Sequence, residues 1–174
     1  MVQLRSLFYI GPSFDTLYSE YAQKGRIDER APVKARGEIT INAPIEKVWE
    51  VLINLPDWPH FDPSFSAIKL ESDVSVGAKA SFKLKGFPIH GVFATVDVNR
   101  ELTWVGTSLW TKAIDRHFIE HTSDGLTRLL LEESLAGLFA PLMISSRVLR
   151  VQHEVWLRGI KSAIETSVKK SIHP

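Results

Sequence analysis

The 174-residue sequence contains no cysteine. The absence excludes disulfide bonds, catalytic thiolates and zinc held by cysteine, and it fits a reducing compartment. The sequence also lacks any run of about 18 apolar residues, the length that a membrane-spanning helix requires. Its beginning, "MVQLRSLFYIGPSF", has one Arg and a very short apolar patch, less than a secretory signal needs. We therefore expect a cytoplasmic protein without a membrane span.

An excess of either charge is missing as well. Lys and Arg number 21 against 20 Asp and Glu, which gives a formal net charge of +1. Proteins that bind nucleic acid usually carry a clustered basic excess, so we expect no nucleic-acid partner. The length is sufficient for one well-filled core and too short for two, which favours a single main domain.

Motifs that hold metals or cofactors are absent too. There is no HExxH and no other close spacing of His and carboxylate ligands, so we expect no metal site. A Gly-rich phosphate loop and the GxSxG of an acyl-transfer nucleophile are also lacking. We expect no cofactor, and nucleotide or flavin binding is not indicated.

Residues 1–34 are predicted to form an extension, and residues 35–174 the main domain. The charged stretch "QKGRIDERAPVKARG" is typical of a connector. Before it, Ser13 can cap a short helix that ends at Gly25. This helix would present an apolar face of Phe14, Leu17, Tyr18 and Tyr21. The face could pack on the main domain, act as a lid or form a homodimer contact.

The main domain is predicted to begin with a strand and a helix. "ARGEITINA" alternates between apolar and polar residues, as a half-buried strand does. Pro44 fits the first turn of a helix. Pro56 is expected to end that helix, because the residue before a proline avoids the α conformation. Apolar residues recur between them at helical spacing, at Ile45, Val48, Trp49 and Leu52.

Residues 64–137 alternate with a period of two and predict an antiparallel meander. "GAKASFKLKG" is the clearest strand, with Ala and Phe on one face and Lys on the other. An open sheet would leave one face unburied, so a cover is needed. The last segment supplies it, as a helix of about seven turns with one apolar stripe. The stripe contains Leu149, Trp156, Ile160, Ala163, Ile164 and Ser167.

We therefore predict an α+β fold. A curved antiparallel sheet of about six or seven strands would wrap around the long C-terminal helix, with two short helices after the first strand. Strand alternation turns Asp115, His117 and Glu133 toward the concave face. A carboxylate beside an imidazole can raise its basicity, and burial would raise the pKa of Glu133. The three residues could act as a general base on an enolisable carbonyl, or form a satisfied polar network. His153 is expected at the edge of the core.

Four stretches resemble the START-like, helix-grip (SRPBCC) superfamily and its polyketide cyclase/dehydrase-like proteins. They are "ITINAPIEKVWEVLINLPDWPHFDP", "RELTWVG", "DGLTRLLLEESLAG" and the long terminal helix. The resemblance runs from Ala35 to Ser167. One departure is Phe61-Asp62-Pro63, where members commonly have Trp-Asn-Pro; it adds a carboxylate near the entrance. The resemblance implies a deep cavity between sheet and helix, used across the superfamily for lipids, sterols, polyketides and plant hormones.

The function expected first is binding of a small hydrophobic or amphipathic molecule in this cavity. Prolines 56, 59 and 63 would hold Trp58 and Phe61 over its opening as a gate, although both rings could instead plug the end of the barrel as core. A second hypothesis is a polyketide cyclase or dehydratase with His117 or Glu133 as base and Asp115 in support. A third is an interaction protein that binds a partner through the extension. The ligand is expected to be enclosed by Trp58, Phe61, Phe82, Trp104, His117, Leu131, Trp156 and Ile160.

Overall fold

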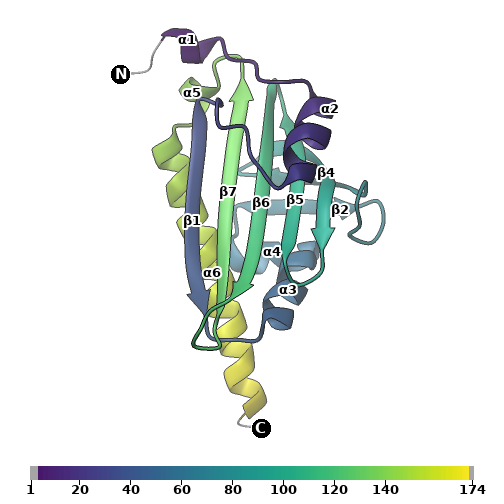
Figure 1. Ribbon diagram of the computed structural model, residues 1–174, viewed down its shortest axis with the longest axis vertical. Helices are drawn as coiled ribbons and strands as arrows, with labels where there is room; N and C mark the ends of the chain where they lie inside the picture. Colours follow the sequence, from purple (N-terminus) through teal and green to yellow (C-terminus); the bar gives the residue numbers. More distant parts are fainter. Residues whose placement is uncertain (1–3, 173–174) are drawn as a thin grey trace.

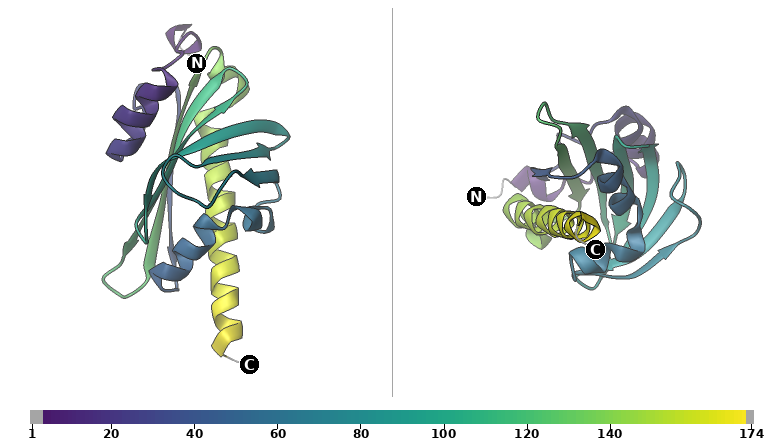
Figure 2. Two further views of the ribbon diagram at one scale, coloured as in Figure 1. Left: turned by 90° about the vertical axis from the view of Figure 1, so that its right-hand side faces the viewer. Right: turned by 90° about the horizontal axis from the view of Figure 1, so that it is seen from below.

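The computed structural model describes residues 4–172, with the side chains of residues 6–167. One antiparallel sheet of seven strands, in the order β1-β7-β6-β5-β4-β3-β2, curves around the long helix α6, Ser146–Ile172 (Figures 1 and 2). The strands are β1 Val33–Ile41, β2 Phe65–Leu70, β3 Lys79–Leu84, β4 Phe87–Asp97, β5 Glu101–Ser108, β6 Thr111–His121 and β7 Thr127–Gly137. The α+β helix-grip prediction is confirmed.

The curvature of the sheet has local causes. Register shifts interrupt the pairing of β2 with β3, between Ser66 and Lys69, and of β4 with β5, between Phe93 and Thr95. Such bulges bend a strand and increase its twist. The strands therefore form a trough with α6 inside it, as the end-on view in Figure 2 shows.

Three helical segments connect β1 to β2 at one end of the trough. They are α3, Ile45–Ile53; a 3₁₀ turn, Leu55–Asp57; and α4, Trp58–Phe61. The apolar stripe of α3 is buried as predicted. The helix already ends at Ile53, and Pro56 and Pro59 start the two short turns that follow, where proline's missing N–H costs nothing.

The N-terminal extension comprises α1, Leu4–Leu7; α2, Phe14–Thr16; a π-helical turn, Leu17–Tyr21; and a 3₁₀ turn, Ala22–Lys24. The segment from α2 to Lys24 lies on the convex face of the sheet, opposite α6 (Figure 2). α1 lies beside α5, Ala140–Met143, at one end of the sheet (Figure 1). The predicted ends are present: the Ser13 side chain accepts a hydrogen bond from the Thr16 N–H, and Gly25 has φ 65°. The lid hypothesis is wrong, since the extension covers the face that the cavity does not use.

The aromatic face of the extension packs on the sheet. Leu17, Ala22 and Ile27 share a buried cluster with Ala94, Val105 and Ile114 from β4, β5 and β6. The Tyr18 hydroxyl donates a hydrogen bond to the Phe93 carbonyl at 3.2 Å. This face therefore packs on the main domain, the first of its three predicted roles, and a homodimer contact through the extension stays a prediction.

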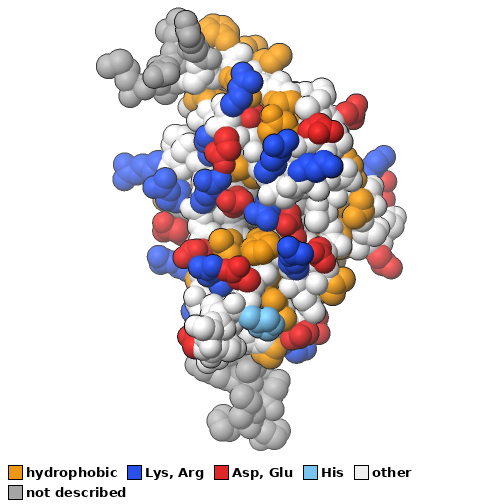
Figure 3. All heavy atoms as spheres, viewed as in Figure 1, with side chains coloured by type: hydrophobic (Ala, Val, Ile, Leu, Met, Phe, Trp, Pro, Cys, Tyr) orange, Lys and Arg blue, Asp and Glu red, His pale blue; other side chains and the backbone are white. Residues whose placement is uncertain are grey.

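The rest of the convex face carries charges of both signs (Figure 3). Arg116 on β6 pairs with Glu101 and with Glu132, each at 2.9 Å, and Arg36 on β1 pairs with Glu132 at 2.8 Å. Charged residues thus occupy the outward strand positions, and the inward positions are left for the core. Within residues 4–172, every helix is either too short or too polar to cross a membrane.

Gly159 marks the closest approach of α6 to the α4 segment. A Cβ at this position would overlap the backbone carbonyl of Phe61, which cannot move as a flexible side chain could. Replacing an exposed helical glycine by alanine ordinarily stabilises a helix by about 1 kcal/mol. We predict the opposite sign for Gly159→Ala, a loss of about 1–3 kcal/mol in the free energy of unfolding.

Urea denaturation checks this prediction, with Ser162→Ala as the control. Ser162 is an exposed position three residues after Gly159 on α6. The control is expected to be neutral or slightly stabilising. Stabilisation of both variants to the same extent would contradict the close contact.

Candidate functional site

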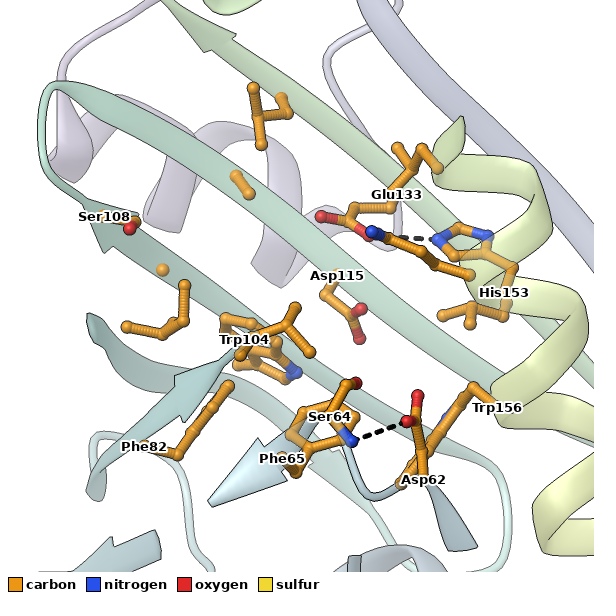
Figure 4. Close-up of a pocket in the computed structure, with 18 of the residues that line it drawn as sticks. Asp62, Ser64, Phe65, Phe82, Trp104, Ser108, Asp115, Glu133, His153 and Trp156 are labelled. Carbon is orange, nitrogen blue, oxygen red and sulfur yellow. Dashed lines mark hydrogen bonds and ion pairs between the residues drawn. The ribbon is translucent and has the colours of Figure 1, made fainter. Parts of the chain in front are cut away.

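A cavity of about 130 Å³ lies between the concave face of the sheet and α6. Figure 4 shows its wall, with side chains from β2 to β7 and from α6 pointing into it. An engineered cavity of about 150 Å³ in another protein holds benzene, so a guest with one aromatic ring fits this space. The lining residues are Trp58, Asp62, Ser64, Phe65, Phe82, Leu84, Ile89, Trp104, Gly106, Thr107, Ser108, Thr111, Ala113, Asp115, His117, Leu131, Glu133, Leu135, Ile144, Leu149, Gln152, His153 and Trp156.

Aromatic rings form one end of the cavity. Trp58 meets Trp156 edge to face, with ring centroids 5.1 Å apart, and Phe65 lies 5.1 Å from Trp156. Phe82 continues the cluster to Trp104 at 5.7 Å. Trp58 is 2% exposed and donates from Nε1 to the Leu52 carbonyl at 3.2 Å, so it is fixed as part of the core. Such edge-to-face contacts are the favoured geometry of aromatic pairs, and they hold the wall rigid.

Two glycines position the ring of Trp104. Gly91 on β4 and Gly106 on β5 are register partners. A Cβ at Gly91 would lie 3.1 Å from the indole Cε3 atom, and a Cβ at Gly106 would overlap the ring. The indole therefore lies flat on bare backbone, which leaves its N–H edge directed along the cavity wall toward Asp115 (Figure 4).

A row of polar groups crosses the sheet inside the cavity. Trp104 on β5 is the register partner of Asp115 on β6, and Asp115 is the partner of Glu133 on β7. Side chains at directly opposite positions lie on the same face of a sheet, so all three face α6. The structure thus brings together the three residues singled out from the sequence, since His117 follows Asp115 two residues later on the same face.

His117 connects the sheet to α6. The Trp156 Nε1–H donates a hydrogen bond to His117 Nε2 at 2.9 Å, and the imidazole is 2% exposed. The other nitrogen, Nδ1, lies 2.9 Å from Asp115 Oδ1. These two atoms are close but poorly aligned, and neither has a hydrogen bond among the described residues. Both nitrogens of His117 are therefore occupied or blocked by protein groups.

Glu133 pairs with a residue that the sequence analysis left at the edge of the core. His153 on α6 is 3% exposed, and its Nε2 lies 3.0 Å from Glu133 Oε2. Burial raises the pKa of Glu133, the carboxylate of Asp115 raises it further, and the hydrogen bond with His153 opposes the rise. Only one signal in the sequence indicated this pair: His153 precedes Trp156 by three residues, which sets both on one face of α6.

Four buried polar atoms have no hydrogen-bond partner among the described residues. They are Trp104 Nε1, Asp115 Oδ1, His117 Nδ1 and His153 Nδ1. All four belong to residues that line the cavity. An unsatisfied buried donor or acceptor costs about 1–3 kcal/mol, and such groups in a native structure call for a partner.

Of the eight residues expected to enclose a ligand, six line the cavity and two do not. Trp58, Phe82, Trp104, His117, Leu131 and Trp156 are at the wall. Phe61 is not, because the turn of α4 carries it to the outer side of Trp156, at a centroid distance of 6.2 Å. Ile160 is not, because it lies one helical turn past Trp156 and is fully buried in the core with Leu52. Trp58 forms part of the closed end rather than a gate.

The sequence analysis missed several wall residues, and Phe65 is the most prominent. It starts β2 beyond the prolines, and its ring contacts those of Trp58, Phe82 and Trp156. Asp62 also lines the cavity, as its place near the entrance predicted, and its Oδ1 accepts a hydrogen bond from the Ser64 N–H at 2.9 Å. Among the described residues, no group of three or more His, Cys, Asp or Glu side chains is placed to hold a metal ion.

Most of the chain matches a known protein family. The family described as "Polyketide cyclase / dehydrase and lipid transport" matches residues 32–165, well over half of the chain. The chain belongs to this family. The START-like resemblance drawn from the sequence is confirmed. No curated protein matches the chain.

Solved structures with this fold have low sequence identity to this chain. A hypothetical protein from Helicobacter pylori matches with a TM-score of 0.69 at 17% identity, covering 78% of this chain and 89% of its own. The Zhui aromatase/cyclase from Streptomyces sp. R1128 matches with a TM-score of 0.66 at 13% identity, covering 78% and 94%. A START superfamily protein from Mycobacterium smegmatis matches with a TM-score of 0.65 at 10% identity, covering 76% and 97%. At these identities the likeness establishes the fold alone.

The raised pKa of Glu133 predicts a pH dependence of stability. The folded state holds the proton of Glu133 at pH values above its ordinary pKa of 4.5, where the unfolded state has already lost it. The contribution of Glu133 to stability is therefore complete below that pKa and is lost as pH rises through the folded-state value. We predict that Glu133→Gln removes this loss, so its advantage in unfolding free energy over the wild type grows as the pH rises above the ordinary pKa of 4.5.

Denaturant titrations of both proteins across this range are the measurement. Parallel stability curves for the two proteins would show that Glu133 ionises as freely in the folded state as in the unfolded one.

Proposed function

We propose that the protein binds a small hydrophobic or amphipathic molecule, lipid-like or polyketide-like, in the cavity between the sheet and α6. The observation that carries the proposal is a hollow with an aromatic end and unpaired polar atoms in its wall. Ligand sites are mostly apolar with a few polar groups that orient the guest. The family's description, which includes lipid transport, supports the same conclusion.

The polar atoms of the wall set how a guest would be held. The Trp104 N–H is a donor and Asp115 Oδ1 an acceptor, on neighbouring strands, and neither has a hydrogen-bond partner in the part of the chain that the structure describes. A guest with one oxygen and one donor group near a ring would pair with both atoms and place its ring among the aromatic side chains. Binding would then remove two unsatisfied groups, each of which costs about 1–3 kcal/mol in the empty protein.

Native mass spectrometry of the purified protein tests the proposal. A fraction of the wild type is expected to carry an added mass that disappears on denaturation. Ala113→Phe fills the cavity from β6 and is expected to abolish this mass, whereas Glu120→Phe adds the same bulk on the opposite face of the strand and is expected to retain it. Equal retention by both variants would contradict binding in the cavity.

A catalytic role is the second candidate, favoured by one observation. The pKa of Glu133 is raised by burial in the cavity wall, which brings a carboxylate closer to the range of an effective general base. Glu133 suits this role better than His117, since both nitrogens of His117 face protein groups. The base would remove a proton α to a carbonyl, and the Trp104 N–H would donate to the enolate oxygen that forms.

Exchange of the methyl protons of acetophenone in deuterated water, followed by NMR, tests this candidate with a one-ring ketone. The base removes a proton to give the enolate and returns a deuteron from solvent, so no further reactant is needed. Glu133→Gln is expected to lower the protein-dependent rate at least about 100-fold. Glu154→Gln, which removes an exposed carboxylate on α6, is expected to leave it unchanged. Equal rates in both variants would reject Glu133 as the base.

A further inference from the structure

The cavity wall is acidic, since its described lining residues include three carboxyl groups, those of Asp62, Asp115 and Glu133, and no Lys or Arg. The other titratable groups among these described residues are His117 and His153. The charge that a guest meets therefore depends on what the two imidazoles neutralise.

His117 does not neutralise Asp115. An indole N–H can only donate, so the hydrogen bond from Trp156 requires an unprotonated Nε2. Its proton therefore sits on Nδ1, and the ring is uncharged. Its Nδ1–H faces Asp115 Oδ1 at 2.9 Å without the alignment of a hydrogen bond, because the two side chains stand next to each other on one strand.

His153 pairs with one carboxyl group of the wall, that of Glu133, through its Nε2 atom. No ion pair joins His153 to Asp115 in the described structure. Asp62 is held at the rim by the Ser64 N–H. Asp115 thus remains as a carboxylate that is 8% exposed, reaches into the cavity, and has no Lys or Arg paired with it among the side chains of residues 6–167. A buried charge of this kind is costly unless a counter-ion pairs with it.

The rings around Asp115 are suited to a cation. Phe65 and Trp156 line the part of the cavity toward which the Asp115 carboxylate points (Figure 4). The faces of aromatic rings carry partial negative charge and attract ammonium groups, most strongly when water is excluded. An anion in the same place would face the Asp115 carboxylate and the negative faces of the rings, and the described lining residues include no Lys or Arg to offset them.

We infer that the cavity selects an organic ammonium ion, an amine attached to a ring or a short hydrocarbon, with Asp115 as its counter-ion. Fatty acids and other anionic amphiphiles are excluded by the same charges. The inference rests on the proposed function, because it names the class of guest for that cavity.

Three one-ring probes that differ only in the head group test the selection: benzylamine, benzyl alcohol and benzoate. Each is titrated into the wild type at neutral pH, with binding followed by isothermal calorimetry and by the fluorescence of the cavity tryptophans. Benzylamine is expected to bind at least about tenfold more tightly than benzyl alcohol, since a buried ion pair and ring contacts are added. Benzoate is expected not to bind.

Asp115→Asn removes the charge and keeps the shape. Its expected effect is loss of the preference for benzylamine while the affinity for benzyl alcohol stays within a few-fold. Asp97→Asn makes the same change in net charge at an exposed site on β4, beside Arg100, and is expected to keep the preference. This control separates the local carboxylate from the overall charge of the protein.

The outcomes distinguish the inference from the proposed function. If benzyl alcohol and benzoate bind as tightly as benzylamine, the cavity takes ligands but does not select cations, and only the inference is overturned. Retention of the preference in Asp115→Asn overturns the counter-ion role, and the wild-type series still decides charge selection should that variant not fold. If none of the probes binds, the proposed function fails and the inference falls with it.

Discussion

The hydrogen bond from Trp156 to His117 is the constraint on which the site depends. It is a direct polar link between α6 and β6, beside the second link that His153 makes to Glu133 on β7. Both rings are buried and line the cavity. The same bond fixes the tautomer of His117, leaves Asp115 without a charged partner, and so determines the chemistry of the wall as well as its shape.

The interior as a whole balances two demands. Buried aromatic rings and aliphatic side chains stabilise the domain by about 25 cal/mol for each Å² of apolar surface removed from water. A cavity forfeits part of that gain, and each unpaired polar atom in its wall costs more. Filling the space with leucine and valine would remove both penalties. A wall that keeps Trp104, Asp115, Glu133 and His153 around an open volume is therefore better explained by a guest than by stability.

The N-terminal extension covers an apolar part of the convex face of the sheet. The convex side of β4, β5 and β6 carries Ala94, Val105 and Ile114, which would be an exposed apolar patch without the cluster around Leu17. Beside this patch the strands turn to paired charges, with Arg116 held between Glu101 and Glu132. The sheet is thus closed on the convex side by packing, and only its concave side is free to hold a ligand.

The sequence predicted the features that follow from periodicity. Alternation along β6 and β7 put Asp115, His117 and Glu133 on the concave face, because a strand has only two faces and charged Arg116 and Glu132 had to occupy the other one. The prediction from the sequence failed for residues whose place in the cavity depends on the distance between two elements. Ile160 lies on the predicted apolar stripe of α6, yet it lies beyond the cavity, because helical spacing carries no information on where a cavity stops. Phe61 was expected over the opening because of the prolines around it, and their positions do not specify which way its ring points.

The pairing of His153 with Glu133 was missed for a related reason. A strand residue and a helix residue meet only through the crossing angle and register of α6 on the sheet, which neither local pattern contains. Solved structures at 10–17% identity have the same trough and long helix. Such structures share the fold with this chain. The class of ligand therefore has to be inferred from the side chains that line this chain's cavity. The fold explains why a space exists, and the inferred preference for an ammonium ion depends on Asp115 and its neutral neighbour His117.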